Sequence, residues 1–245
     1  MNNIKKLLAL ALSGALIAAL CAVIFVNKSA EVSKPSISEP EQVLLNFQER
    51  RGRAASLKII TPTGGHGTGT LFKYDGNLVI FTAAHVTTEG PVYLAQDQWG
   101  EQKFAVLVYA DRDADFAVLV VDEFEKTKPV RFKLPDYDVR NKIDLEVVFS
   151  GYPSSHDLLT MRGSIAGFEG PSMIVNSSAW GGSSGSSVFD KSGRFVGILY
   201  GVSVAHSFSG PRILENFIWV MPNDQIKWGE LSEALDAVRA VRERE

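Results

Sequence analysis

The chain has 245 residues, of which 45% are hydrophobic and 10% aromatic, enough to bury a sizeable core. Its formal net charge is −3, and no stripe of lysine and arginine runs through the globular part, which disfavours nucleic-acid binding. The single cysteine, Cys21, excludes a disulfide framework within one chain. Many short apolar runs indicate two packed halves.

The N-terminal segment differs in kind from the rest. Lys5 and Lys6 precede residues 7–26, which carry no charged side chain and would span about 30 Å as a helix. We therefore expect residues 1–28 to be a signal anchor or a signal peptide, and the weak cleavage-site pattern favours an uncleaved membrane anchor. The two lysines should stay in the cytoplasm, which puts the globular part on the extracytoplasmic side, periplasmic or extracellular. Cleavage of the segment would instead make the protein secreted.

Residues 29–52 are predicted to form a polar tether and then a short helix. The proline-bearing stretch 29–42 has the composition of a linker. Residues 41–51 place apolar side chains at helical spacing, with acids first and bases last. At the other end of the chain, residues 226–245 are predicted to form a C-terminal helix, with Asn223 as its cap.

Between these segments, short β-prone runs alternate with turn residues such as those at positions 75–77. They define one predicted domain, residues 53–225, which divides near residues 125–142 into two sets of six strands. The first set is Ala54–Ile60, Gly67–Lys73, Leu78–Thr82, Val92–Ala95, Phe104–Ala110 and Phe116–Val121, and the second is Leu145–Phe149, Leu158–Phe168, Met173–Asn176, Ser187–Phe189, Phe195–Tyr200 and Phe217–Met221.

A glycine- and serine-rich stretch, residues 180–190, surrounds Ser184. A serine hydroxyl needs a neighbouring base and a backbone free of bulk before it can act as a nucleophile at neutral pH. A turn built on these glycines could aim the N–H groups of Gly182 and Ser184 at one point beside the hydroxyl. His85, at the end of an apolar strand, is the candidate base.

Three alternating aspartates, Asp111, Asp113 and Asp115, supply candidates for the acid that orients His85. On a strand all three would share one face, so that any of them could do so. The same spacing opens like a calcium loop, but Phe116 stands where such a loop needs glycine. We therefore expect no metal site there, and no cofactor.

The joint pattern resembles the trypsin-like, chymotrypsin-fold serine proteases, especially compact bacterial members such as the glutamyl endopeptidases and the high-temperature-requirement proteases. The resemblance covers residues 54–235 and implies two packed six-stranded antiparallel β-barrels. It selects Asp115, which with His85 and Ser184 would form the triad of a serine endopeptidase acting through an acyl-enzyme, and it implies an oxyanion hole at Gly182 and Ser184. The motifs that carry it are Gly67–Phe72, Thr82–His85, Asp115–Leu119, Gly182–Ser186 and Val196–Ile198.

The resemblance also implies where a polypeptide substrate would bind. Ser178 would lie near the floor of the primary specificity pocket, and no charged side chain would line its wall. We therefore expect an uncharged residue on the acyl side of the cleaved bond. Too little chain follows Leu235 for a PDZ domain, so peptide-gated control of an oligomer is not expected. The wall residues would be Leu199, Tyr200, Gly201 and Val202.

Two other functions remain open from the residues alone. The stretch 181–185 also fits the G-x-S-x-G nucleophile elbow of α/β-hydrolases, which would make Ser183 the nucleophile of an esterase. That fold, however, wants its histidine after the serine and alternating β/α units. A protease-like domain can also lose activity and persist as a binding module tethered to a membrane. The sequence does not indicate an oligomeric state.

Overall fold

The computed structural model describes residues 45–154, 156–207 and 210–242. The predicted anchor, including the apolar run 7–26, and most of the predicted tether lie outside the described residues. Within the described ranges, no helix is both long and apolar enough to cross a bilayer.

The first six strands close into one barrel. The strand order is β1-β4-β5-β6-β3-β2, and β1 also pairs with β2, which completes the ring. Every pairing within the ring is antiparallel. A short strand, β7 (Val130–Arg131), adds to β2 in parallel. The barrel strands are β1 (Ser56–Ile60), β2 (His66–Tyr74), β3 (Asn77–Thr82), β4 (Val92–Gln96), β5 (Gln102–Asp111) and β6 (Phe116–Val121).

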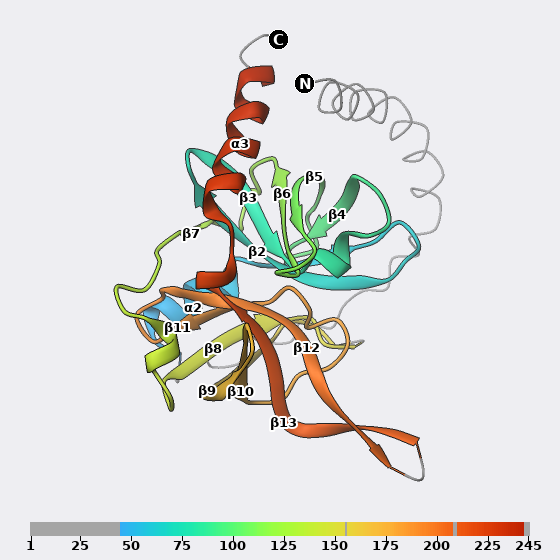
Figure 1. Ribbon diagram of the computed structural model, residues 1–245. Coiled ribbons are helices and arrows are strands. Elements are labelled where there is room, and N and C mark those ends of the chain that lie inside the picture. The colour runs from blue at the N-terminus through green and yellow to red at the C-terminus, as the bar shows by residue number, and fades with distance from the viewer. Residues whose placement is uncertain (1–44, 155, 208–209, 243–245) are drawn as a thin grey trace. The chain divides into compact units, whose positions relative to one another are not determined.

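The next six strands close into a second barrel in the order β10-β13-β12-β11-β8-β9. All of its pairings are antiparallel. Figure 1 shows this barrel in yellow and orange below the blue and green first barrel. The predicted pair of six-stranded antiparallel barrels is confirmed. The strands are β8 (Glu146–Gly151), β9 (Leu159–Glu169), β10 (Ser172–Asn176), β11 (Ser187–Asp190), β12 (Phe195–Ser207) and β13 (Gly210–Pro222).

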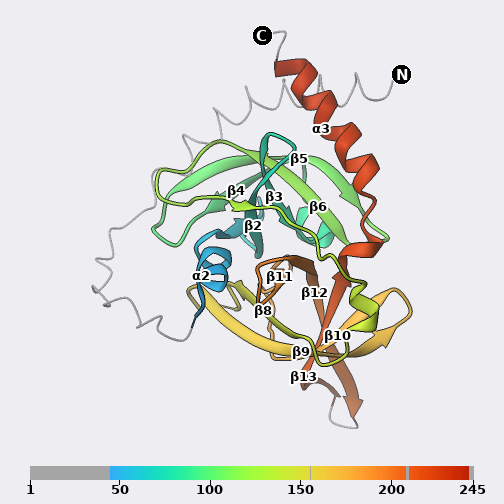
Figure 2. The same ribbon diagram turned by 90° about the vertical axis from the view of Figure 1, so that its left-hand side faces the viewer.

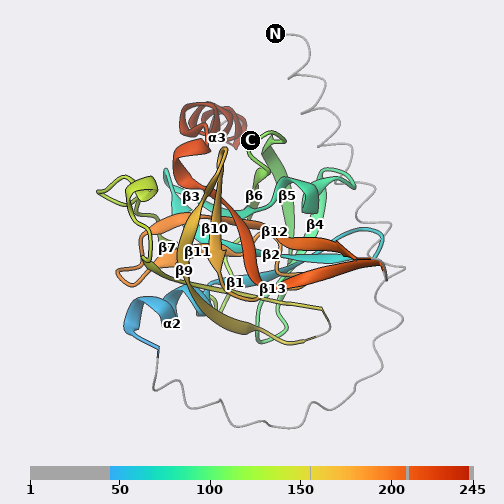
Figure 3. The ribbon, with the colours of Figure 1, turned by 60° about the horizontal axis from the view of Figure 1, so that its bottom comes forward.

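The last two strands are longer than predicted. Instead of ending at Tyr200 and resuming at Phe217, their pairing continues to Ser207 opposite Gly210. The hairpin extends away from the barrel in Figures 1 and 3. The prediction followed runs of apolar residues, whereas strand pairing needs only an extended backbone with a partner.

Helix α2 (Phe47–Ala54) begins later than predicted. A capping box sets its start: the Asn46 side chain accepts the Glu49 amide proton at 2.9 Å, and the Glu49 carboxylate accepts that of Asn46 at 2.7 Å. The helix ends at Ala54, beyond the predicted range 41–51, and β1 begins only at Ser56. Figure 2 shows α2 beside the second barrel.

Helix α3 (Trp228–Arg242) ends the described chain and lies along the first barrel (Figures 1 and 2). Asn223 does not cap it. Asn223 begins a separate 3-10 turn, η4 (Asn223–Gln225), and its side-chain amide donates to the Phe195 carbonyl oxygen at 2.9 Å. The helix therefore begins at Trp228, two residues later than the predicted range 226–245.

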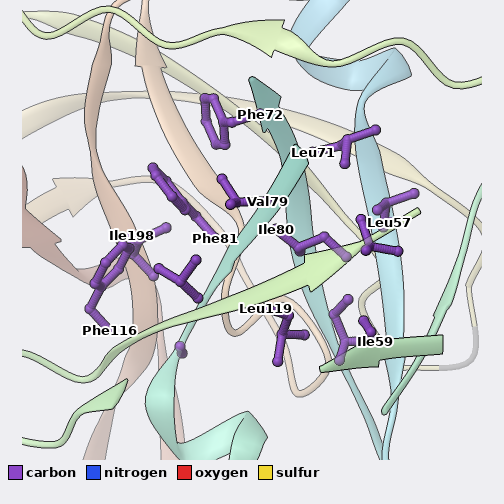
Figure 4. Close-up of a cluster of buried hydrophobic side chains, with 14 of the residues drawn as sticks. Leu57, Ile59, Leu71, Phe72, Val79, Ile80, Phe81, Phe116, Leu119 and Ile198 are labelled. Atoms are coloured by element: carbon purple, nitrogen blue, oxygen red, sulfur yellow. The ribbon is translucent and has the colours of Figure 1, made fainter. Parts of the chain in front are cut away.

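One hydrophobic core fills the first barrel and continues past it. Phe81 and Phe116 lie inside the barrel, and Ile198 of the second barrel packs onto the same cluster (Figure 4). Leu231 and Leu235 of α3 belong to this cluster too, and both are fully buried. A separate cluster fills the second barrel. Close packing of this kind transmits strain rather than absorbing it, so the junction between the barrels is a rigid place to hold a site.

Candidate active site

His85 lies in a single 3-10 turn, η2 (Ala84–Thr87), shortly after β3. Ala83 and Ala84 are fully buried, which seats this turn against the first barrel. The side chain of His85 is 47% exposed, so the imidazole is the part of the turn that solvent and substrate can reach.

Asp115 holds this turn through both its carboxylate and its backbone. Its Oδ2 lies 2.7 Å from Nδ1 of His85, and its Oδ1 accepts the His85 amide proton at 2.8 Å. Its backbone oxygen accepts the amide proton of Ala84 at 3.1 Å. An ionised carboxylate can only accept, so Nδ1 carries the proton and Nε2 keeps its lone pair. Such an imidazole can take up a proton at Nε2.

Asp111 and Asp113 do not share this role. The chain turns after Asp111, the last residue of β5, so the expectation that the three aspartates lie on one face of a strand is wrong. Oδ1 of Asp111 accepts the amide protons of Asp113 at 3.0 Å and Ala114 at 3.2 Å. This side chain-to-backbone turn leads into Asp115, whose φ is 44°.

The turn that carries Ser184 requires glycine at two places. Gly182 and Gly185 have φ of 93° and 91°, values that other residues rarely adopt. The amide of Ser183 donates to the carbonyl oxygen of Trp180 at 2.9 Å, and the amide of Gly185 donates to the carbonyl oxygen of Leu199 at 2.7 Å. Within the described part of the chain, the amides of Gly182 and Ser184 donate to no acceptor. These two N–H groups are therefore free to bind an anionic oxygen.

The first barrel holds this turn directly. A β-carbon on Gly185 would lie 2.0 Å from the Thr68 oxygen, 2.3 Å from the Thr82 hydroxyl and 3.0 Å from the Ala83 amide. Thr82 and Ala83 lead straight into the turn of His85, so Ser184 and His85 are brought to the same edge of the barrel. Their side chains share no hydrogen bond in the described part of the chain. In the absence of substrate, such bonds are often long or poorly aligned.

A family model of the trypsin-like peptidase domain matches residues 67–198, more than half of the chain. The chain belongs to the trypsin-like peptidase family. This match includes His85, Asp115 and Ser184. No curated protein matches this peptidase by sequence.

Solved serine proteases share the fold of this peptidase at low sequence identity. An inactive form of the Rv3671c protease, a protein of M. tuberculosis H37Rv, is 18% identical with a TM-score of 0.61, over 82% of this chain and 99% of that one. A serine endoprotease from Yersinia pestis is 20% identical with a TM-score of 0.56, over 72% and 62%. The HtrA-type protease AlgW, solved with a tripeptide, is 18% identical with a TM-score of 0.57, over 79% and 62%.

The residues predicted to contact substrate differ in their setting. The side chain of Leu199 is 1% exposed and belongs to the core of the second barrel, so it can offer only backbone groups. Tyr200 lines a cavity of about 570 Å³ together with His85 and Asp115. Its hydroxyl lies 2.7 Å from that of Ser172. This cavity lies beside the imidazole, and Ser184 is not among the residues that line it.

Ser178, Gly201 and Val202 lie elsewhere on the second barrel. The hydroxyl of Ser178 donates to the Asn216 side-chain oxygen at 3.4 Å. Gly201 faces Trp219, and Val202 packs against the core of the barrel. No charged side chain takes part in these described contacts.

His66 is half-buried and lies close to the Ser184 turn. Its Nε2 lies 2.9 Å from the Tyr152 carbonyl oxygen, and its ring lies against Gly182, where a β-carbon would approach it to 2.6 Å. It therefore supports the turn that carries Ser184, a role that only the pairing of distant segments reveals. His156 is exposed, and the side chain of His206 lies outside the described residues.

The esterase alternative with Ser183 as nucleophile fails on two grounds. Both halves of the fold are antiparallel barrels, without the alternating β/α units of an α/β-hydrolase. Ser183 itself is fully buried, so its hydroxyl cannot reach a substrate.

Proposed function

We propose that this peptidase is a serine endopeptidase that cleaves polypeptides through an acyl-enzyme. Ser184 is the nucleophile, His85 the general base and Asp115 the residue that orients the imidazole. The observation that carries the proposal is the 2.7 Å contact between Nδ1 of His85 and Asp115, because it leaves Nε2 as the basic nitrogen. The free amides of Gly182 and Ser184 support the same assignment.

The reaction follows from these groups. Nε2 of His85 takes the proton of the Ser184 hydroxyl as its oxygen attacks the substrate carbonyl carbon. The amides of Gly182 and Ser184 stabilise the resulting oxyanion, and removing one such donor costs about 3 kcal/mol in other enzymes. His85 then gives its proton to the leaving amine. A water molecule, activated in the same way, releases the acyl group and restores Ser184.

We further infer that the residue on the acyl side of the cleaved bond is uncharged. Ser178 and Asn216 offer neutral hydrogen-bonding groups, and Val202 adds an apolar one. Burying a charged substrate side chain without a partner charge costs several kcal/mol. A free-energy difference of about this size is enough to separate good substrates from poor ones.

We also propose that residues 7–26 anchor the enzyme, with its protease domain on the extracytoplasmic side. The support is the uncharged apolar run behind Lys5 and Lys6. Alkaline extraction of membranes tests this directly: an anchored protein stays with the lipid, and a soluble full-length protein in the wash would overturn the proposal.

A fluorophosphonate probe followed by peptide mapping tests the mechanism. The probe reacts with an activated serine, so we expect labelling at Ser184 that is lost in His85→Ala. Absence of labelling in the unaltered protein would favour an inactive binding module, and labelling at another serine would contradict the assignment of Ser184.

A further inference from the structure

The start of helix α3 contacts the Asp115 turn on both sides. Before the turn, Nζ of Lys227 lies 3.0 Å from Oδ2 of Asp111. After it, the ring of Trp228 packs against that of Phe116 at 5.9 Å between centroids. Phe116 directly follows Asp115 in the chain. Lys227, just before α3, and Trp228, its first residue, thus hold both ends of one short turn.

Asp111 transmits the first of these contacts to Asp115. Its carboxylate is 5% exposed, so it needs partners for both oxygens. Lys227 pairs with one oxygen, and the other accepts the amide protons of Asp113 and Ala114 that shape the turn. Burial opposes ionisation, but the ion pair with Lys227 and the hydrogen bonds from these amides hold the pKa of Asp111 below its ordinary value. The pair is therefore charged at neutral pH.

Trp228 transmits the second contact through the core. Its ring lies 6.0 Å from that of Phe81, which in turn lies 5.1 Å from Phe116. Its indole N–H donates to the Asn223 oxygen at 3.0 Å, which fixes the ring at the beginning of α3. Because these rings are closely packed, a shift of α3 would move Phe116 and with it Asp115.

We propose that Lys227 and Trp228 are positioning residues for Asp115, so that α3 must be docked for His85 to be held in its productive orientation. This inference rests on the proposed function. Neither residue touches the substrate or the reacting atoms. Both act through the Asp111–Phe116 turn.

The chain contains a matched control. Arg239, further along α3, donates to Asp75 at the β2–β3 turn, with 3.1 Å between Nη2 and Oδ2. This ion pair also joins α3 to the first barrel, but it is remote in sequence from the Asp115 turn. Removing it therefore weakens a contact between α3 and the first barrel that does not involve the Asp115 turn.

The test compares Lys227→Gln with Arg239→Gln in the full-length protein. We expect Lys227→Gln to lower kcat by about tenfold or more with little change in KM, since a displacement of about 1 Å in a catalytic group can cost about 100-fold. Lys227→Arg should restore most of kcat, and Arg239→Gln should leave it unchanged. Asp111→Asn keeps an acceptor for the two amides, and its effect on kcat should be strongly non-additive with that of Lys227→Gln.

A second readout is the proton NMR signal of the His85 Nδ1–H, which does not depend on peptide cleavage. It should broaden or shift in Lys227→Gln and stay in place in Arg239→Gln. Equal kcat and an unchanged signal in both variants, with both folded, would overturn the positioning role. Absence of Ser184 reactivity in the unaltered protein would instead overturn the proposed function, while the NMR comparison would still decide the role of Lys227.

Discussion

The hydroxyl of Thr68, in the first barrel, donates a 2.7 Å hydrogen bond to the carbonyl oxygen of Gly182, within the turn that carries Ser184. The same hydroxyl accepts the amide proton of Tyr152 at 3.0 Å, and the Thr68 amide donates to the Ser184 oxygen at 2.8 Å. One residue of β2 therefore holds both sides of the Ser184 turn. The location of Ser184 relative to His85 therefore depends on contacts between the two barrels.

Replacing Thr68 with valine keeps its shape but removes the hydroxyl. The Gly182 oxygen and the Tyr152 amide would lose their partner, which should lower the free energy of unfolding by about 1–3 kcal/mol. A relaxed turn should also lower kcat. Urea unfolding and peptide hydrolysis check both effects, with Thr68→Ser as the control. A Thr68→Val variant as stable and active as Thr68→Ser would show that the bridge is dispensable.

Gly185→Ala should disrupt the Ser184 turn. The new methyl group would lie 2.0 Å from the backbone carbonyl oxygen of Thr68, which cannot move aside as the end of a flexible side chain could. The φ of residue 185 is 91°, which alanine rarely adopts. We expect a loss of at least about 2 kcal/mol in stability together with loss of activity. Gly181→Ala is the control, because nothing lies within 4 Å of its added methyl group. If both variants behaved alike, the close approach would have no consequence.

Asp115→Asn should separate catalysis from folding. Asparagine tolerates the φ of 44° at this position, so stability should change little. Its amide group can impose the wrong tautomer on His85, and the equivalent change in another triad lowers kcat by about 10⁴-fold. Hydrolysis rates and thermal unfolding provide the measurement. Asp113→Asn, which alters a neighbouring carboxylate without contact to His85, should keep near-normal activity.

Stability should fall in alkaline solution because of Tyr109. Burial, together with the charges of Asp111 and Glu230, raises its pKa from 10.0 to about 12. Between these pH values the unfolded chain has lost this proton and the folded chain has kept it, so stability decreases as pH rises. Burial also raises the pKa of Tyr137 and Tyr152. Tyr109→Phe should therefore reduce the slope of urea midpoint against pH without abolishing it; an identical slope would contradict this account.

Ser178→Asp should change which peptides are cut. A carboxylate at this position would provide the charge that a buried lysine or arginine side chain needs. A peptide library should show cleavage mainly after uncharged residues for the unaltered enzyme and increased cleavage after basic residues for the variant. Frequent cleavage after Lys, Arg or Glu by the unaltered enzyme would show that the neutral pocket is misassigned.

Several features of this fold were predictable because they depend on local chemistry. The runs that became β3 and β6 are continuously apolar and bounded by turn residues, so their strand character follows from composition. The capping box at Asn46 is a local pattern too, although the expected helix was placed too early. Residue chemistry alone could not decide whether Asp111 or Asp115 contacts His85. The alternating aspartates also fit a continuous strand, so the pattern did not indicate the turn between them.

By itself, the sequence determined the strands of the two barrels and the segments that carry His85 and Ser184, since both follow from side-chain periodicity and from glycine at particular positions. The family resemblance selected the aspartate that lies against the imidazole, where residue chemistry alone left three open. Only the tertiary structure decided that Thr68 bridges to Gly182 across 114 residues and that Lys227 reaches Asp111. Contacts of this kind depend on how distant segments pack in the closed barrels, and a hydroxyl or an ammonium group looks the same in a sequence whether it faces water or a partner.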